Sequence, residues 1–290
     1  MALDEADMHR LGLNFLYQMT PVIIVSVLYG IYIAVLVLAT QAIAERGLKN
    51  SVNATILAIL YVVFLFTSAL WGIGLVHILS LNHVMLLAPN GLSGDALFNR
   101  YYVLLARETR IMDILFHCQM ILGDILVIWR AAAIWHDRRA FVLIPFFWWA
   151  LMIVSMLINA SFCPYGLSST DYTNFCHTMD ILVPVTSILV NVSVMALTFA
   201  KAWHLRAGLR GTLRLRRKRS KLLTLFTLFI ESGTLYVIML TAEVVAASFV
   251  PDSLETPAEF IDYLFGASSV QIVGIYPTLM IVVLRQSIWN

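Results

Sequence analysis

Hydrophobic residues along this chain gather into seven long runs, and the polar and charged residues stand between the runs. None of the runs alternates apolar and polar positions as a membrane β-strand does, and each is roughly two to three times too long for one. A helix needs about 20 apolar residues to cross the hydrocarbon core of a bilayer, because its backbone groups must be satisfied within the segment. The pattern therefore predicts an all-α bundle of seven transmembrane helices, at Pro21–Ile43, Ala54–Leu81, Ile111–Trp135, Phe141–Phe162, Ile181–Trp203, Leu222–Phe249 and Ile261–Leu284.

The overall composition leads to the same class. Of the 290 residues, 60% are hydrophobic and only 12% are charged, and the mean hydropathy is +0.85. So few polar residues cannot coat a soluble globule of this size. The first run follows Asp4, Glu5 and Asp7 rather than a basic segment and is too long for a signal peptide, so we expect a retained first helix. We interpret residues 1–290 as one membrane domain.

The basic residues predict the orientation. Nine Lys and Arg residues lie between Lys201 and Lys221, and the loop 204–221 is the most basic segment of the chain. With the amino terminus outside, fourteen basic flanking residues lie on the cytoplasmic side and four lie outside. The positive-inside rule therefore predicts an outside amino terminus and, after seven spans, a cytoplasmic carboxyl terminus. The loop 204–221 is also a candidate contact for a cytoplasmic signalling partner or for anionic lipid.

Two of the three cysteines fall in one outer loop. Cys163 and Cys176 would both face an oxidising compartment, so a disulfide between them is a possible cross-link of the fourth and fifth spans. Cys118 falls inside the third span, and we interpret it as a small buried apolar residue.

Ionisable residues at membrane depth are costly and often mark function. In the third span Asp113, His117 and Asp124 are separated by four and then seven residues. At 100° per residue the three side chains point within about 40° of one direction. We expect them to form a polar stripe that faces the bundle interior.

A second pair lies deeper, toward the cytoplasm. Arg130 of the third span and Glu231 of the sixth fall at comparable depth, so they could form a salt bridge. One interpretation is a latch between the inner ends of the two helices that a ligand outside loosens. The other is a permanent pair that only neutralises buried charge.

Further polar residues accumulate near the outer ends of the spans. Histidine and carboxylate ligands together suit zinc, but no His-x-x-x-His pair occurs, and we assign no metal site. A solvated vestibule or a polar pocket for a small molecule is the alternative, with Asp113, His117, Asp124, Asp180 and Gln271 as the expected ligand-binding residues. The outer set comprises His77, Asp113, His117, His177, Asp180 and Asp262.

Proline residues interrupt two spans. Pro277 and Pro184 each remove a backbone donor, so we expect a hinge in the seventh and in the fifth span. No span contains a lysine inside it, which excludes a retinal Schiff base, and we expect no cofactor. The chain also lacks a nucleotide-binding glycine loop, a Gly-x-Ser-x-Gly elbow and a His-Glu-x-x-His motif. We expect no nucleic-acid partner.

Three motifs carry a resemblance to a known group. They are Gly123–Ala131 (GDILVIWRA) with Trp135 after it, Ile230–Tyr236 (IESGTLY) and Gln271–Leu279 (QIVGIYPTL). With them the chain resembles a large group of seven-span proteins from mushroom-forming fungi. That group carries no established activity, so the resemblance implies the span pattern and no function.

The architecture also resembles that of G-protein-coupled receptors, with an outside amino terminus and a basic third inner loop. The departures are specific. Ile128-Trp129-Arg130 stands in place of Asp-Arg-Tyr, and Gly274-Ile275-Tyr276-Pro277 stands in place of Asn-Pro-x-x-Tyr. No cysteine lies at the outer end of the third span. We therefore do not expect membership of the main receptor class, and a separate receptor-like family is the interpretation that stays open.

These observations lead to a functional hypothesis: a multi-pass protein, of the plasma membrane rather than an internal one, that senses a small ligand outside and signals through the inner ends of helices three and six. Two alternatives remain open. One is an intramembrane metal-dependent hydrolase that uses the outer His and Asp set. The other is a carrier or channel that uses the stripe from Asp113 to Asp124.

Overall fold

The computed structural model describes residues 5–45, 51–87, 94–163, 170–207, 216–249 and 257–289. These residues form long α-helices and one short 3₁₀ turn, and no strand occurs among them. The all-α prediction is confirmed. The elements are α1 (Glu5–Ala44), α2 (Ser51–Leu87), α3 (Gly94–Ile134), η1 (Arg139–Val142), α4 (Leu143–Phe162), α5 (Thr170–Ala207), α6 (Arg216–Phe249) and α7 (Pro257–Trp289).

Six of these helices are long and apolar enough to cross a membrane, so the chain is a multi-pass membrane protein. They correspond to the expected spans one to five and seven. The expected sixth span, Leu222–Phe249, falls within α6, which is not among the six; the side chains of residues 205–229, and with them most of the basic loop, lie outside what the structure describes. The apolar segments are Met19–Ala44, Ser51–Ser80, Arg110–Ile134, Arg139–Phe162, Phe175–His204 and Tyr263–Val282.

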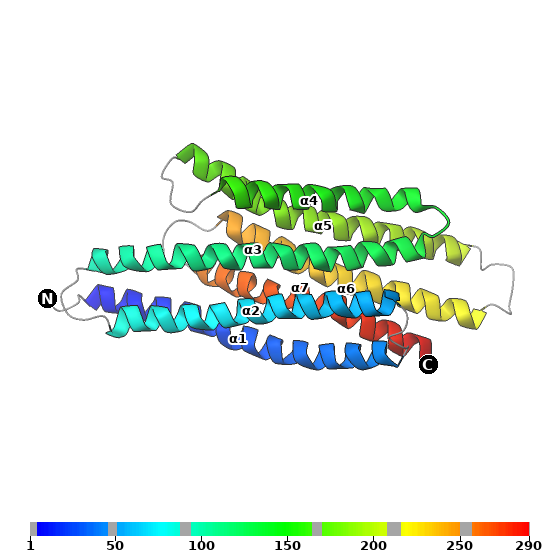
Figure 1. The fold of residues 1–290 in the computed structure, drawn as a ribbon, viewed down its shortest axis with the longest axis horizontal. Coiled ribbons are helices and arrows are strands. Elements are labelled where there is room, and N and C mark those ends of the chain that lie inside the picture. Colours follow the sequence, from blue (N-terminus) through cyan, green and yellow to red (C-terminus); the bar gives the residue numbers. More distant parts are fainter. Residues whose placement is uncertain are drawn as a thin grey trace.

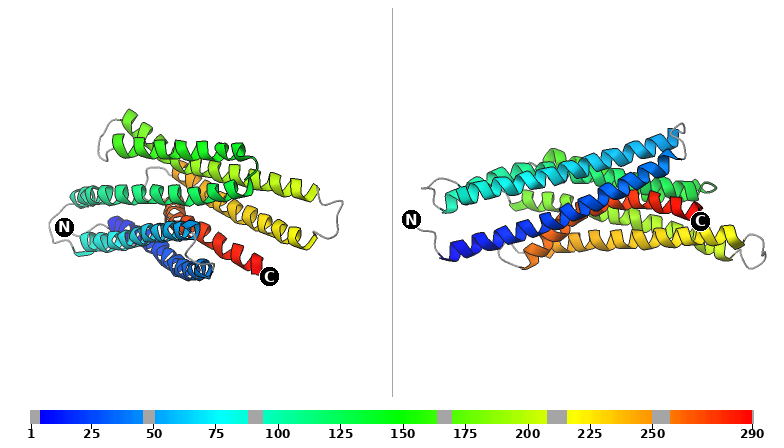
Figure 2. Two further views of the ribbon diagram at one scale, coloured as in Figure 1. Left: turned by 45° about the vertical axis from the view of Figure 1, so that its right-hand side comes forward. Right: turned by 90° about the horizontal axis from the view of Figure 1, so that it is seen from below.

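The long helices run roughly along one common direction (Figures 1 and 2). In Figure 1 α3 crosses the middle of the bundle, with α4 and α5 above it and α1 and α2 below it. Helix α3 packs against α2, α4, α5 and α7, and α7 packs against α1, α2, α3 and α6. The two termini lie at opposite ends (Figure 1). We call the end at which α1, α3, α5 and α7 begin the amino end, and the other the carboxyl end.

Several helices extend beyond the apolar runs that predicted them. Helix α1 begins at Glu5 rather than Pro21, and α3 begins at Gly94 rather than Ile111. The length of the apolar run determines how many residues lie in the hydrocarbon core. The helix itself continues into the polar region until a helix-breaking residue such as proline ends it. No proline occurs between Gly94 and Arg110. The expected outer loop before the third span is therefore largely helix.

The distribution of residues is the reverse of that in a soluble protein. Large apolar side chains cover the outside, with Ile23, Leu79 and Leu235 each about two-thirds exposed (65%, 67% and 66%). Polar side chains lie inside instead, since Gln119 and Gln271 are fully buried. This arrangement fits a bundle whose surroundings are hydrocarbon, where apolar surface costs nothing and polar groups must find partners inside the protein.

Two apolar clusters form the interior. One joins α3, α5, α6 and α7 around Met120, Val127, Tyr236 and Leu240. The other joins α1, α2, α3 and α7 around Tyr32, Leu36, Leu60 and Leu126. Since α3 and α7 contribute to both clusters, they form the centre of the packing.

Both expected hinge prolines lie inside continuous helices. Helix α5 runs through Pro184 and α7 runs through Pro277. Each proline lacks the N–H that would bond the carbonyl four residues earlier, at Asp180 and Val273 respectively. The hinge role itself remains a prediction.

One glycine brings α7 close to two other helices. A Cβ atom on Gly274 would lie 2.8 Å from Cε1 of Tyr32 in α1 and 2.9 Å from Oγ1 of Thr67 in α2. Both neighbours are fully buried and cannot easily move. Only glycine therefore allows α1, α2 and α7 to meet at this level.

The Gly274→Ala substitution should therefore destabilise the bundle. Because the added methyl group overlaps Tyr32 and Thr67, we expect a loss of about 1–3 kcal/mol of unfolding free energy. Thermal unfolding of the purified protein in detergent measures it. Gly266→Ala in the same helix is the matched control, because its Cβ would meet nothing within 4 Å. Equal melting temperatures for the two variants would show that the close approach at Gly274 does not matter.

Candidate ligand cavity and buried polar core

A cavity of about 230 Å³ lies near the amino end of the bundle, between α3, α5 and α6. It is somewhat smaller than the roughly 300–1,000 Å³ of common ligand sites. Polar groups of three helices meet there with a few apolar ones. The lining residues are Asp113, Phe116 and His117 of α3, His177, Asp180, Ile181 and Pro184 of α5, and Glu243 and Val244 of α6.

Helical spacing explains why these side chains converge. Asp113 and His117 are four residues apart, so they lie one turn apart on the same face of α3. On α5, His177, Asp180 and Pro184 are spaced by three and then four residues, which again places them on one face. His177 is exposed and His117 is only 7% exposed, so the cavity leads from the surface to a buried imidazole.

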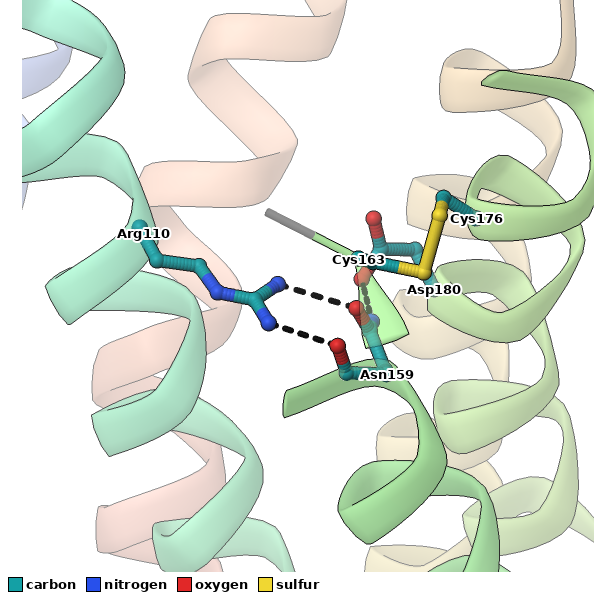
Figure 3. The surroundings of a disulfide bond; sticks show 5 residues. All are labelled: Arg110, Asn159, Cys163, Cys176 and Asp180. Carbon is teal, nitrogen blue, oxygen red and sulfur yellow. Dashed lines mark hydrogen bonds between the residues drawn. A yellow bond between two sulfur atoms is a disulfide. The ribbon is translucent and has the colours of Figure 1, made fainter. Parts of the chain in front are cut away.

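Asp180 is held by a chain of hydrogen bonds from α3 and α4 (Figure 3). The guanidinium of Arg110 donates to the side-chain oxygen of Asn159 at 2.9 Å and to its carbonyl oxygen at 2.6 Å. Since the side-chain oxygen of Asn159 is engaged by Arg110, its amide nitrogen faces α5 and donates to the Asp180 carboxylate. Asn159 is 2% exposed, so this bridge is shielded from solvent.

A disulfide between Cys163 and Cys176 joins α4 and α5 beside this bridge, as the sequence allowed. Cys163 follows Asn159 by four residues and Cys176 precedes Asp180 by four. The disulfide and the Asn159–Asp180 hydrogen bond are therefore two links between the helices, one helical turn apart (Figure 3).

A second group of polar residues lies deeper, in the centre of the bundle. Asp124 is 1% exposed and accepts a hydrogen bond of 2.8 Å from the amide of Asn191 on α5. One turn before Asn191, the hydroxyl of Ser187 lies 3.2 Å from that of Tyr236 on α6. These two bonds join α3, α5 and α6 by buried polar contacts.

Stacked aromatic rings extend this core toward the carboxyl end. Tyr236 and Tyr276 stack with 4.9 Å between ring centroids, and the guanidinium of Arg130 lies 5.9 Å from the centroid of Tyr276. A small cavity of about 20 Å³, lined in part by Arg130, Asn191 and Tyr276, adjoins these groups. That volume suffices for about one water molecule.

The structure brings together part of the expected ligand set. Asp113, His117 and Asp180 line the outer cavity, while Asp124 lies deeper in the polar core. Gln271 lines neither cavity, and among the described residues its buried amide atoms have no hydrogen-bond partner.

Of the outer set, His177 also reaches the cavity, whereas His77 of α2 does not line it and the side chain of Asp262 lies outside the described residues. Glu243 of α6 completes the cavity, and its membership in this group was not expected from the sequence.

Arg130 and Glu231 are not paired here. Glu231 is exposed on α6, whereas Arg130 turns toward Tyr276 of α7 and also donates to the carbonyl of Leu126 at 3.2 Å. The two side chains point in different directions, and the comparable depth of the two residues stays a prediction.

No three His, Cys, Asp or Glu side chains in the described part of the chain converge as metal ligands would. The outer cavity therefore offers dispersed charged groups around an open volume and no compact coordination site. No family model, curated protein or solved structure matches the chain.

Removing the disulfide should loosen the contact between the carboxyl end of α4 and the amino end of α5. For Cys163→Ser combined with Cys176→Ser we expect a loss of about 3 kcal/mol, since a cross-link that closes a loop of this length restricts the unfolded chain by about that amount. Thermal unfolding measures the loss, and Cys118→Ala is the control because Cys118 is a free thiol. Alkylation of three thiols in the unreduced protein, rather than one, would contradict the bridge.

The Asp124–Asn191 bond should matter for stability. Asn191→Ala removes the donor to a buried carboxylate, which costs about 1–3 kcal/mol. The exchange variant that combines Asp124→Asn with Asn191→Asp keeps a donor and an acceptor in place and should recover most of the loss. If the exchange variant is no more stable in thermal unfolding than Asn191→Ala, the contact does not contribute as inferred.

Proposed function

We propose that this chain is a receptor-like protein with seven membrane spans in the plasma membrane. In this proposal a small polar molecule enters the outer cavity from outside, and its binding alters the cytoplasmic ends of α3 and α6, which lie at the carboxyl end of the bundle. The observation that carries the proposal is the cavity at the amino end, lined by ionisable groups from three helices. Ionisable groups within membrane-spanning helices are retained mainly where they serve a function.

Two features support an outside amino end. The disulfide between Cys163 and Cys176 lies there, and disulfides persist in oxidising compartments. The basic residues Arg138, Arg139 and Lys201 lie at the other end, in agreement with the positive-inside rule.

Seven crossings are supported by the geometry of the bundle. The chain begins and finishes at opposite ends (Figure 1). An odd number of crossings is needed for that arrangement, and α6 packs between α5 and α7 as one of the bundle. With α6 added to the six apolar helices, the count becomes seven.

The contacts below the cavity supply a route to the cytoplasmic side. Pro184 lines the cavity, and Ser187 and Asn191 follow it on the same face of α5. Those two residues contact Tyr236 of α6 and Asp124 of α3. A ligand that displaces α5 therefore acts on both helices whose inner ends we propose to move.

The test combines binding with a distance measurement. Spin labels at His136→Cys and Glu231→Cys, in a Cys118→Ala background, report the separation of α3 and α6, and both positions are exposed. A library of small amines, acids, alcohols and sugars is screened by thermal shift in lipid nanodiscs. We expect at least one compound to raise the melting temperature and to change the label distance.

Asp180→Asn should abolish both effects, because Asp180 lines the cavity. Asp137→Asn is the matched control, since Asp137 is exposed at the carboxyl end. A compound that binds without changing the distance, yet crosses liposome membranes only when the protein is present, would replace the receptor proposal with a carrier.

A further inference from the structure

The outer cavity presents hydrogen-bond acceptors and negative charge. Three carboxylates reach it from three different helices: Asp113 from α3, Asp180 from α5 and Glu243 from α6. No Lys or Arg lines the cavity among the described residues. Even with both lining histidines charged, the carboxylates would outnumber them.

A buried histidine faces the same space. His117 is 7% exposed and lines the cavity, and within the described part of the chain its imidazole makes a ring contact with Phe116 but no hydrogen bond. A neutral imidazole offers one acceptor nitrogen, and a carboxylate offers only acceptors. Since His117 lines the cavity, a molecule in the cavity can supply a hydrogen bond to this imidazole.

The walls and the volume distinguish an organic cation from a metal ion. Phe116, Ile181 and Val244 add apolar surface beside the carboxylates. A cavity of about 230 Å³ is far larger than a bare ion, and the described residues hold no cluster of three metal-ligating side chains. A positively charged group on a short carbon skeleton can contact the carboxylates with its charge and the apolar wall with its carbon atoms. The face of an aromatic ring also attracts such a cation.

Asn159 keeps one of these carboxylates available. Arg110 does not line the cavity, and its guanidinium donates two hydrogen bonds to Asn159. Asn159 in turn donates to one oxygen of Asp180. Asn159 thus separates the Arg110 guanidinium from the Asp180 carboxylate and fixes the carboxylate at the cavity wall. Because the carboxylate is already ordered, a cation that binds there loses little affinity to the entropic cost of ordering it.

We propose that the outer cavity binds a small organic ammonium ion with N–H donors, anchored by Asp180 with Asp113, Glu243 and His117 as further acceptors, and that Asn159 is the residue that positions Asp180. The proposal rests on the proposed function only in placing a ligand at this cavity. An ammonium group has donors and no acceptor, which complements a lining of acceptors.

Three probes of one skeleton test the ligand class: 2-phenylethylamine, 2-phenylethanol and phenylacetate. Binding to the full chain in nanodiscs is measured by calorimetry at fixed ionic strength. We expect the amine to bind about tenfold more tightly or better than the alcohol, because hydrogen bonds to charged groups are the stronger ones. Asp180→Asn should weaken the amine by a similar factor and leave the alcohol unchanged.

Asn159→Leu tests the positioning role. Without the amide, Arg110 can reach Asp180 and neutralise it, so affinity for the amine should fall while affinity for the alcohol stays constant. Adding Arg110→Gln to Asn159→Leu should restore part of the amine affinity, which a merely structural role for Asn159 does not predict. If Asp180→Asn fails to fold, Glu243→Gln supplies the same comparison, and Asp137→Asn serves as control.

The outcomes separate this inference from the proposed function. Tighter binding of the alcohol or the acid, or binding of none of the three probes, overturns the ammonium assignment. If the alcohol or the acid binds more tightly and changes the distance between the labels at positions 136 and 231, the receptor proposal stands without the ammonium assignment. If the amine binds as expected but leaves that distance unchanged, the ammonium site stands and the receptor proposal fails.

Discussion

The requirement that polar groups inside a lipid-embedded bundle find partners within the protein governs this structure, and α3 is where it is met. Helix α3 is joined to α4 by Arg110 with Asn159, to α5 by Asp124 with Asn191, and to α7 by Gln119, whose amide donates to the carbonyl of Val270 at 2.6 Å. Lipid offers no alternative partner for any of these groups. Each bond therefore fixes which face of α3 meets which neighbour, a choice that apolar contacts alone do not specify.

Packing divides the interior into a tight part and an open part. Glycines allow close approach at two points: Gly274 against Tyr32 and Thr67, and Gly233, whose Cβ would lie 2.9 Å from the sulfur of Met195. Toward the amino end, α3, α5 and α6 instead carry carboxylates and histidines and leave a cavity between them. Charged groups cannot be packed against one another as methyl groups can, because each needs hydration or a partner. The cavity is thus a consequence of the residues that line it.

The sequence predicted what depends on one helix at a time. Apolar length gave six of the spans, and spacing on α3 placed Asp113 and His117 together. The sequence did not indicate how a second helix is rotated relative to α3, and so which of its side chains face inward. Tyr236 faces the core, and Glu231 is five residues away, about 140° around the helix, so it faces outward. Glu243 is seven residues from Tyr236, about 20° from its direction, and reaches the cavity.

Partners between helices were harder still to foresee. Nothing in the sequence marks Asn159 and Asn191 as partners of α3, because their roles depend on α4 and α5 lying beside α3, which no spacing within one helix reveals. A signal was nevertheless present on α5, where Asp180, Pro184, Ser187 and Asn191 follow one another at intervals of four, three and four residues. That interval marks a single polar face on an otherwise apolar helix.

The same face of α5 borders both the cavity and the buried core. Pro184 removes the N–H that would bond the Asp180 carbonyl, so α5 lacks one backbone hydrogen bond between the cavity and the core. A displacement of the outer turn of α5 can be absorbed at that point unless side chains carry it further. Ser187 lies one turn beyond and contacts Tyr236, and Tyr236 stacks on Tyr276, over which Arg130 lies. These contacts run through aromatic rings and a buried hydrogen bond, so they connect the face of α5 below Asp180 to α6 and α7 without depending on the backbone of α5.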